Sequence, residues 1–333
     1  MKGGFSNQMR GGFNRRGLQR LLQLLITTVG SVRIKLLLLF GVAFTLFVLT
    51  GQVSHLMGWT YIDSSPDPFA GTGYTILINT WKRYDLLKKS IAHYSACGGV
   101  DSIHVVWSEP NPPADSLVKY LRHLVKIKSI ERREVTLVFD INKEDSLNNR
   151  FKEVNLKYDA VFSIDDDVIF PCSSVEFAFN IWRSAPDAMV GYVPRVHWME
   201  KSDTTSNYYN YGGWWSVWWT GTYSMILSKA AFLHKKYFYI YTHKLPASLR
   251  DYVTKNRNCE DIAMSFLVAN MTNAPPIWVK GKIFEIGSTG ISSLGGHQEK
   301  RTLCVNRFVA EFGRMPLVSS SVKAVDSRRT WFW

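Results

Sequence analysis

The chain has 333 residues, enough for one large domain or two ordinary ones; aromatic residues are abundant and no segment is repetitive or of low complexity. Its formal net charge of +13 is typical of nucleic-acid binders, but the charge is unevenly distributed. Seven basic residues precede Asp63, the first acidic residue: Lys2, Arg10, Arg15, Arg16, Arg20, Arg33 and Lys35. The excess charge therefore belongs largely to the leader, which does not favour nucleic-acid binding.

An uncharged run, residues 36–53, directly follows this basic leader. Its length approaches the roughly 20 residues that a membrane-spanning helix needs. A basic flank before the apolar run places the N-terminus in the cytosol and the bulk of the chain across the membrane. A cleavable signal peptide is disfavoured because the run is long and no small-residue cleavage site follows. A buried core helix is the other alternative; we expect a cytosolic tail at 1–35 and a transmembrane signal anchor at 36–53.

The segment 54–73 is rich in proline, glycine and serine, which predicts a short stem. A single globular unit is expected at 74–318, followed by a C-terminal tail at 319–333. The four cysteines, Cys97, Cys172, Cys259 and Cys304, are too scattered for a zinc cluster, and an oxidising lumen permits one or two disulfides. Asn270 begins a glycosylation sequon, in agreement with a lumenal location.

Strands and helices are predicted to alternate through the first half of the globular unit. The strands are apolar throughout rather than alternating, which indicates an α/β fold with a mostly parallel sheet covered on both faces. The expected strands are 74–78, 102–107, 135–139, 160–164 and 188–193, and the expected helices are 84–96, 115–125, 147–157, 174–183 and 260–269. No GxGxxG, P-loop or GxSxG motif occurs, so dinucleotide oxidoreductases, P-loop enzymes and serine hydrolases lose support.

Asp165, Asp166 and Asp167 follow the apolar strand 160–164 directly. Ligands of parallel sheets bind beyond the carboxyl ends of the strands. Three neighbouring carboxylates need a cation, and Mn²⁺ or Mg²⁺ binds both carboxylates and the oxygens of a diphosphate. The triplet therefore predicts a metal–nucleotide site, with Asp165 and Asp167 on the metal side. A solvated acidic turn is the alternative.

Other candidate residues are weaker in isolation. Asp261, in the first turn of a predicted helix, is placed to position an acceptor hydroxyl or stabilise an oxocarbenium ion, although acidic residues at helix starts are common. Arg83 and Arg150 follow predicted strands, where a guanidinium can bind phosphate, but lone arginines are usually surface residues. Arg301 carries no signal alone.

Four indoles within six residues, Trp214, Trp215, Trp218 and Trp219, form an unusual segment. Three interpretations stay open: a stacking platform for sugar rings, a contact with lipid, and core packing. If the segment is extended, its alternation favours one exposed face.

Several segments together resemble the exostosin-like glycosyltransferases of family 64, and in order they span residues 74–316. They are 80–85, 105–107, 147–151, 163–167, 259–264 and 301–304. The short chain with one catalytic domain is most similar to the plant members that mannosylate glycosylinositol phosphorylceramides.

The resemblance implies a GT-A (Rossmann-like) fold, a nucleotide-sugar donor, a Mn²⁺ or Mg²⁺ cofactor and retention of anomeric configuration. By the same resemblance Asp167 binds the metal most directly, with support from Asp165. It also pairs Cys259 with Cys304 in a disulfide and makes Asp261 the catalytic carboxylate. The residues implied to bind the substrates are Thr80, Arg83, Ser108, Arg150, Asp165, Asp166, Asn258, Cys259, Glu260, Asp261 and Arg301.

Two positions depart from the animal members of the family. Ser108 stands where they have a base-contacting asparagine, which leaves the base open and makes GDP plausible beside UDP. Glu260 replaces the first aspartate of their acidic pair, which leaves the catalytic position intact.

We therefore expect a single-pass type II protein of the Golgi membrane that transfers mannose from GDP-mannose to a sphingolipid head group. A stem of about twenty residues would keep the site near the bilayer. The alternative is transfer of N-acetylglucosamine from UDP-GlcNAc to a glycan. Two rivals come from other classes. One is a metal-dependent phosphohydrolase, which would need further histidine or aspartate ligands at a two-metal site, and the other is a non-catalytic carbohydrate-binding scaffold built on the tryptophans.

Overall fold

A computed structural model describes residues 23, 32–56, 73–129, 134–200, 207–287 and 296–327. Two compact units divide the chain, Met1–Ala70 and Gly71–Trp333. The predicted tail before residue 32, apart from residue 23, and the predicted stem between 57 and 72 lie outside the described residues, as do residues 328–333.

The first unit contains α2 (Val32–Leu56), a helix of 25 residues that includes the predicted anchor. Among the described residues, no helix combines the length and the apolar character needed to cross a membrane. The signal anchor therefore remains a prediction from the sequence.

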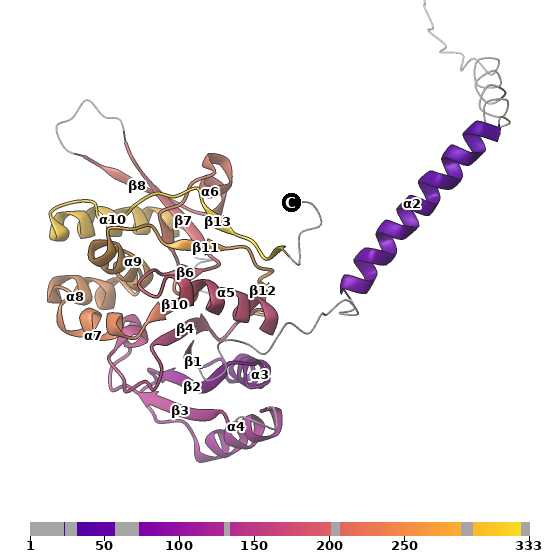
Figure 1. Ribbon diagram of the computed structural model, residues 1–333. Helices are drawn as coiled ribbons and strands as arrows, with labels where there is room; N and C mark the ends of the chain where they lie inside the picture. The colour runs from indigo at the N-terminus through magenta and orange to yellow at the C-terminus, as the bar shows by residue number, and fades with distance from the viewer. Residues whose placement is uncertain are drawn as a thin grey trace, which may run out of the picture. The chain divides into compact units, whose positions relative to one another are not determined.

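The second unit is built on an eight-stranded sheet in the order β13-β11-β6-β10-β4-β1-β2-β3 (Figure 1). The pairings are parallel except for those of β10, which runs antiparallel to both its neighbours. A mostly parallel sheet in an α/β unit is thus confirmed. In sheet order the strands are Lys323–Ala324, Ile277–Val279, Val190–Gly191, Ala230–His234, Ala160–Asp165, Tyr74–Thr80, Val100–Trp107 and Thr136–Ile141.

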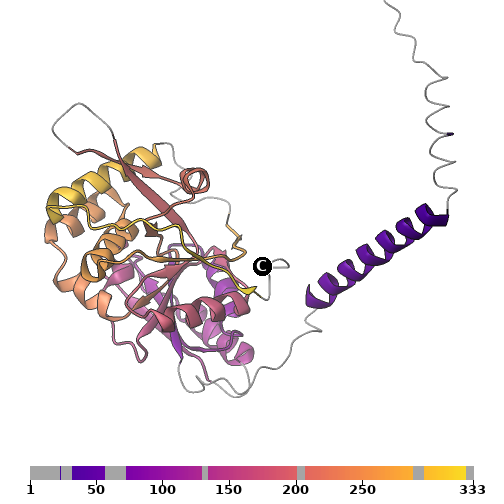
Figure 2. The same cartoon turned by 45° about the horizontal axis from the view of Figure 1, so that its top comes forward.

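Helices cover both faces of the sheet (Figures 1 and 2). Because successive side chains of a strand point to opposite faces, Ile76 and Ile78 of β1 pack with α3, α4 and α5, whereas Leu77 packs with α7 to α10. The first group is Tyr84–Tyr94, Asp115–Lys128 and Cys172–Ser184. The second group is Lys236–His243, Ala247–Asn256, Glu260–Thr272 and His297–Phe312. Both faces are therefore buried, as the uniformly apolar strands require.

Smaller elements extend from this framework. β8 (Tyr209–Gly212), β7 (Pro194–Met199) and β9 (Met225–Ile226) form a three-stranded sheet that carries α6 (Trp214–Thr220). β5 (Val168–Ile169) pairs with β12 (Phe284–Glu285). β13 lies in the segment expected to be the C-terminal tail.

Two expectations about local structure are corrected. The helix expected at 147–157 is only a 3-10 turn, η1 (Leu147–Phe151). The Asn148 side chain donates to the Arg250 carbonyl at 2.8 Å and the Asn149 side chain donates to the Glu144 carbonyl at 2.7 Å, so η1 is held against α8 and the segment before it. The strand expected at 188–193 shortens to β6. Residues 214–219, whose conformation the sequence left open, are helical.

Two disulfides fasten the unit. Cys259–Cys304 joins the start of α9 to α10, which confirms the pairing that the family resemblance implied. Cys97–Cys172 joins the end of the α3 region to the start of α5, a pairing that the sequence left open. These bonds close loops with sequence separations of 45 and 75 residues, and such closures restrict the unfolded chain.

Candidate active site

The carboxyl ends of three adjacent strands define one edge of the sheet. β4, β1 and β2 are parallel neighbours, with Asn79 paired to Asp165 and Thr80 paired to Trp107. This register brings Thr80, Ser108 and Asp165 to the same edge. The strands themselves are immobilised by burial on both faces, so the polar residues that follow them have a rigid support.

The three aspartates divide into one buried and two partly exposed carboxylates. The Asp166 side chain is 0% exposed, whereas those of Asp165 and Asp167 are 24% and 21% exposed. Thr80 donates its hydroxyl to Asp166 Oδ2 at 2.7 Å, and Arg83 pairs with Asp166 and, at 2.7 Å, with Asp167 Oδ2. Burial raises the pKa of Asp166 to about 6, although the Thr80 hydroxyl and the Arg83 guanidinium act to lower it. Asp166 is thus held inward by protein partners.

Arg150 is the buried guanidinium between two acidic groups. It pairs with Asp165 Oδ1 and donates to the Ser228 hydroxyl at 3.2 Å. Burial acts to lower the pKa of Arg150, but the attraction of Asp165 and Glu260 outweighs it and the pKa is raised. Arg150 therefore remains charged and links the strand-end aspartates electrostatically to the start of α9.

The start of α9 has an unusual backbone. Cys259 precedes the helix with a φ of 75°, in the left-handed region that L residues rarely adopt. The Asn258 side chain accepts a hydrogen bond from the Cys259 amide at 2.8 Å, and the disulfide to Cys304 fastens the same residue. This turn buries Glu260 and Asp261 together.

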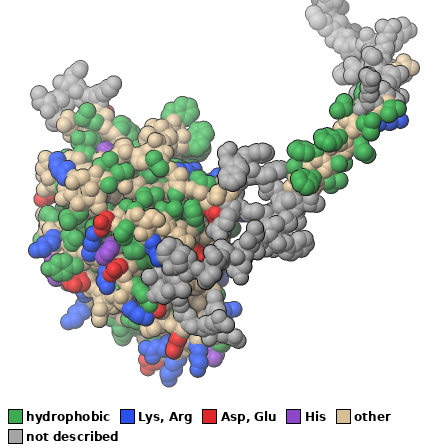
Figure 3. Space-filling model, in the orientation of Figure 1, with side chains coloured by type: hydrophobic (Ala, Val, Ile, Leu, Met, Phe, Trp, Pro, Cys, Tyr) green, Lys and Arg blue, Asp and Glu red, His purple; other side chains and the backbone are tan. Residues whose placement is uncertain are grey.

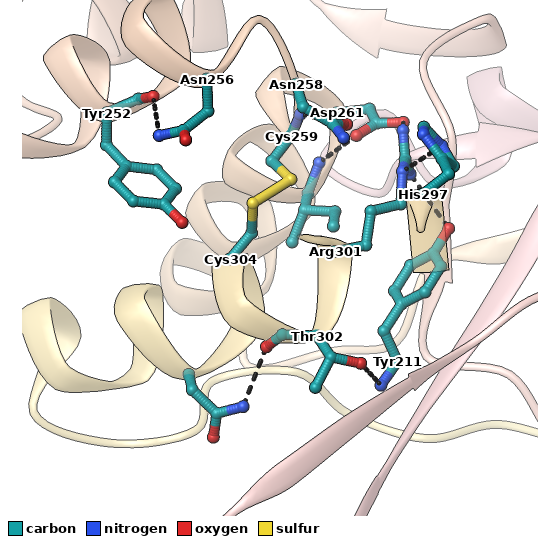
Figure 4. The surroundings of a disulfide bond; sticks show 12 residues. Tyr211, Tyr252, Asn256, Asn258, Cys259, Asp261, His297, Arg301, Thr302 and Cys304 are labelled. Carbon is teal, nitrogen blue, oxygen red and sulfur yellow. Dashed lines mark hydrogen bonds and ion pairs between the residues drawn. A yellow bond between two sulfur atoms is a disulfide. The ribbon is translucent and has the colours of Figure 1, made fainter. Parts of the chain in front are cut away.

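Asp261 and Arg301 form a buried ion pair at 2.9 Å (Figure 4). Arg301 also donates to the Tyr211 hydroxyl at 3.0 Å and to His297 Nε2 at 2.9 Å, so the guanidinium is fixed on all sides. Burial acts to raise the pKa of Asp261, but the Arg301 guanidinium outweighs it and the pKa is lowered. Burial and the neighbouring Asp261 raise the pKa of Glu260 to about 7. Adjacent carboxyls with diverging pKa values are typical of acid–base sites.

Four residues near the site went unnoticed in the sequence. Glu109 accepts hydrogen bonds from the Lys82 amide (2.8 Å) and the Tyr84 hydroxyl (2.7 Å), which fixes the turn before Arg83. Tyr211 and His297 hold Arg301, and a Cβ on Gly287 would lie 2.8 Å from Asp167 Cβ. Of these four residues, only Glu109 could have been found from the sequence, because it lies just after a predicted strand.

Ser108 faces the same region but has a protein partner. Its hydroxyl accepts a hydrogen bond from the Asn149 side chain at 2.9 Å, and it is buried. The sequon residue Asn270 lies at the other end of α9, where its side-chain oxygen Oδ1 accepts a hydrogen bond from Arg314 at 2.8 Å.

The donor set at the strand edge fits a hard divalent cation. Asp165 Oδ2 and Asp167 Oδ1 accept no hydrogen bond from any described residue, while their other oxygens are paired. Among the described residues, the one group of three metal-type side chains within coordination reach of each other is His93, Cys97 and Cys172, whose sulfurs are already joined. The aspartates thus offer a partial set of oxygen ligands, which phosphate oxygens would complete, as is usual for Mg²⁺ and similar ions.

A pocket of about 490 Å³ is lined by residues of the β7–β8 hairpin and of α10. Its lining combines aromatic rings with amide, hydroxyl and carboxylate groups, a mixture that suits a sugar. The lining residues are Trp198, Tyr208, Asn210, Tyr211, Gln298, Glu299, Thr302 and Leu303. Tyr211 belongs both to this lining and to the group of side chains that holds Arg301, while Arg301 and Asp261 themselves do not line the pocket.

The raised pKa of Glu260 predicts a pH-dependent stability effect. Since the folded pKa of about 7 exceeds the ordinary 4.5, the contribution of the neutral form is complete below about pH 4.5 and is lost as the pH rises through 7. Glu260→Gln mimics the neutral form. We expect it to melt roughly 4 °C above the wild type at pH 8.5, with no difference at pH 4.5, as measured by calorimetry without metal. A constant difference at both pH values would contradict the raised pKa.

The glycosyl transferase family 64 domain matches residues 74–331. Glycosylinositol phosphorylceramide mannosyl transferase 1 of Arabidopsis thaliana is 64% identical over 96% of this chain and 95% of its own length. Exostosin-2 of Homo sapiens is 36% identical over 75% of this chain, which corresponds to only 33% of exostosin-2.

A solved structure, the mannosyltransferase PcManGT from Pyrobaculum calidifontis in complex with GDP-Man and Mn²⁺, shares 14% identity and a TM-score of 0.38, covering 67% of this chain and 59% of that one. At this level it carries no argument about the fold or the ligands. The family match covers most of the chain and includes every strand-end and helix-start residue of the site. The chain therefore belongs to glycosyl transferase family 64 and is a glycosyltransferase.

Proposed function

We propose that this enzyme transfers mannose from GDP-mannose to the head group of a glycosylinositol phosphorylceramide, with a divalent cation and with retention of configuration. The observation that carries the proposal is the 64% identity, over almost the whole of both chains, to a protein named as such a mannosyl transferase. The edge of the sheet and the start of α9 supply the groups that this reaction needs. The anomeric configuration of the product, determined by NMR, tests the retaining course.

The donor diphosphate would bind at the strand edge. The Arg83 side chain is 31% exposed, whereas those of Arg150 and Arg301 are only 5% and 8% exposed. Arg83 is therefore the guanidinium that reaches a ligand, while the buried pair holds Asp165 and Asp261 in position. Asp165 and Asp167 would hold Mn²⁺ or Mg²⁺, which when bound neutralises charge on the departing diphosphate.

Asp261 would act at the sugar. Arg301 keeps this carboxylate ionised, so it can stabilise positive charge that develops at the anomeric carbon or attack that carbon. Burial keeps water from screening that interaction. The pocket between the β7–β8 hairpin and α10, which shares Tyr211 with the contacts of Arg301, would receive part of the acceptor glycan.

Nucleotide binding tests this proposal most simply. In the presence of Mn²⁺ we expect the purified chain to bind GDP at least tenfold more tightly than UDP, and Asp167→Asn to abolish this metal-dependent gain, by titration calorimetry. Turnover of GDP-mannose, with slow hydrolysis when no acceptor is present, should accompany GDP binding. Preference for UDP and UDP-GlcNAc would contradict the mannosyl assignment, and cleavage of a plain phosphoester would point to a hydrolase instead.

Asp261→Asn is the contrasting variant in the same assay. Its side chain can still accept a hydrogen bond from Arg301 but carries no charge. It should bind GDP within about threefold of the wild type and lose transfer by at least about a hundredfold, the usual cost of removing a group that stabilises the transition state. Thermal melting and the near-ultraviolet spectrum establish that the variant is folded. Full transfer activity in the folded variant would remove Asp261 from the mechanism.

We also propose a Golgi location, with the catalytic unit in the lumen and residues 36–53 as the anchor. The support is the basic leader before an uncharged run, together with two disulfides, which persist in oxidising compartments. Expressed in cells, the full chain should stay with membranes after alkaline extraction and carry an endoglycosidase-sensitive glycan that Asn270→Gln removes. Release by alkali, or a cytosolic unglycosylated chain, would contradict this location.

A further inference from the structure

An uncharged surface segment carries an exposed row of tryptophans. Residues 207–228 contain no acidic, basic or histidine side chain. Within them, α6 presents Trp214, Trp215, Trp218 and Trp219 with exposed fractions of 48%, 76%, 60% and 82%. We call these four side chains the indole face. Such exposure excludes the core-packing interpretation, because a core indole is almost wholly covered.

The geometry of α6 presents these rings rather than burying them. Helical spacing places the four indoles on one side, and Val217, 1% exposed, lies on the other side against the β7–β8 hairpin. The hairpin allows close contact at Gly212, where a Cβ would lie 2.6 Å from Ser216 Cβ. Figure 3 shows hydrophobic side chains gathered at the upper edge of the catalytic unit, where Figure 1 places α6.

Two lysines lie at the edge of the indole face. Trp278 meets Trp214 edge-on with ring centroids 5.8 Å apart, and Lys323 Nζ lies 4.0 Å from the centre of the Trp278 ring. Burial and the positive charge of Lys280 lower the pKa of Lys323, so the two ammonium groups repel each other. Neither lysine forms an ion pair with a carboxylate among the described residues. An anionic group would relieve this repulsion.

The indole rings suit an interface better than a sugar. Trp215 and Trp218 stand nearly perpendicular at 85°, so they offer no continuous flat platform. None of the four indole N–H groups donates a hydrogen bond to another described residue. An apolar ring body with a free polar donor fits the boundary between acyl chains and head groups, where tryptophan is enriched.

We propose that the indole face, together with Trp278, Val322 and the Lys280–Lys323 pair, docks the catalytic unit on an anionic membrane interface. Val322 is 71% exposed and adds apolar surface beside Lys323. The indoles enter the head-group region and the lysines pair with lipid phosphate. Because α6 packs on the hairpin that lines the sugar-sized pocket, docking brings that pocket to the membrane that would carry the lipid acceptor. The docking itself does not depend on which sugar is transferred.

A depth measurement on the full chain tests this proposal. All four native cysteines are in disulfides, so Trp219→Cys introduces one thiol for a nitroxide label. The labelled chain is reconstituted into nanodiscs that contain phosphatidylserine. We expect the label at 219 to be shielded from a water-soluble nickel relaxant and accessible to oxygen, as at a membrane interface. A matched label at Tyr120→Cys on α4, where the tyrosine is 50% exposed, should stay accessible to nickel.

The lysine contribution has its own readout. The double variant Lys280→Gln with Lys323→Gln should shift the docked–undocked equilibrium in these nanodiscs about thirtyfold towards the undocked state. Each basic residue near an anionic surface strengthens binding by a similar factor, and the two factors multiply. The proposal fails if the label at 219 is as accessible to nickel as the label at 120. It also fails if the shielding persists without a bilayer and is accompanied by spin–spin broadening, because the face would then join two copies of the chain. Neither result depends on the transferase activity, so a failure here is distinct from a failure of the proposed function.

Discussion

The active site depends on one buried guanidinium between two acidic groups that come from distant parts of the chain. Arg150 pairs with Asp165 at the end of β4 and attracts Glu260 and Asp261 at the start of α9. Arg150 is almost wholly buried, so removal of Asp165 would leave an uncompensated charge in the interior, at a cost of up to about 3–5 kcal/mol. The strand edge, which would hold the donor, and the helix start, which would act on the sugar, are therefore held in one fixed arrangement by the same side chain.

The rest of the unit supports this network of charges. Parallel strands buried on both faces fix the position of Asp165, and the Cys259–Cys304 disulfide fixes a left-handed residue immediately before Glu260. Arg301 pairs with Asp261, so acidic and basic side chains alternate from Asp165 through Arg150 and Asp261 to Arg301. Burial and the negative charge of Asp261 raise the pKa of Glu260, whereas the paired Arg301 lowers the pKa of Asp261, so the two adjacent carboxyls differ in charge.

The sequence predicted most of the framework, and its failures have physical causes. A uniformly apolar run before Asp165 indicated a buried strand with carboxylates at its end, and β1 and β2 were equally clear. The helix expected at 147–157 is instead a 3-10 turn at 147–151, where the Asn148 side chain donates to the Arg250 carbonyl, a contact 102 residues away in sequence that local propensity does not report. Arg150 and Arg301 resembled ordinary surface arginines, since burial of a charged side chain is decided by partners distant in sequence, such as Ser228 and Tyr211. The helical state of the tryptophans was likewise fixed by packing on a hairpin rather than by their own preference for strands.

A double-mutant cycle between Arg150 and Asp165 measures the central interaction directly. The unfolding free energies of the wild type, Arg150→Gln, Asp165→Asn and the double variant would be obtained by urea titration with the disulfides intact. The account predicts a coupling of at least about 1 kcal/mol, because the double variant no longer buries an unpaired charge. Additive effects, with a coupling near zero, would contradict it.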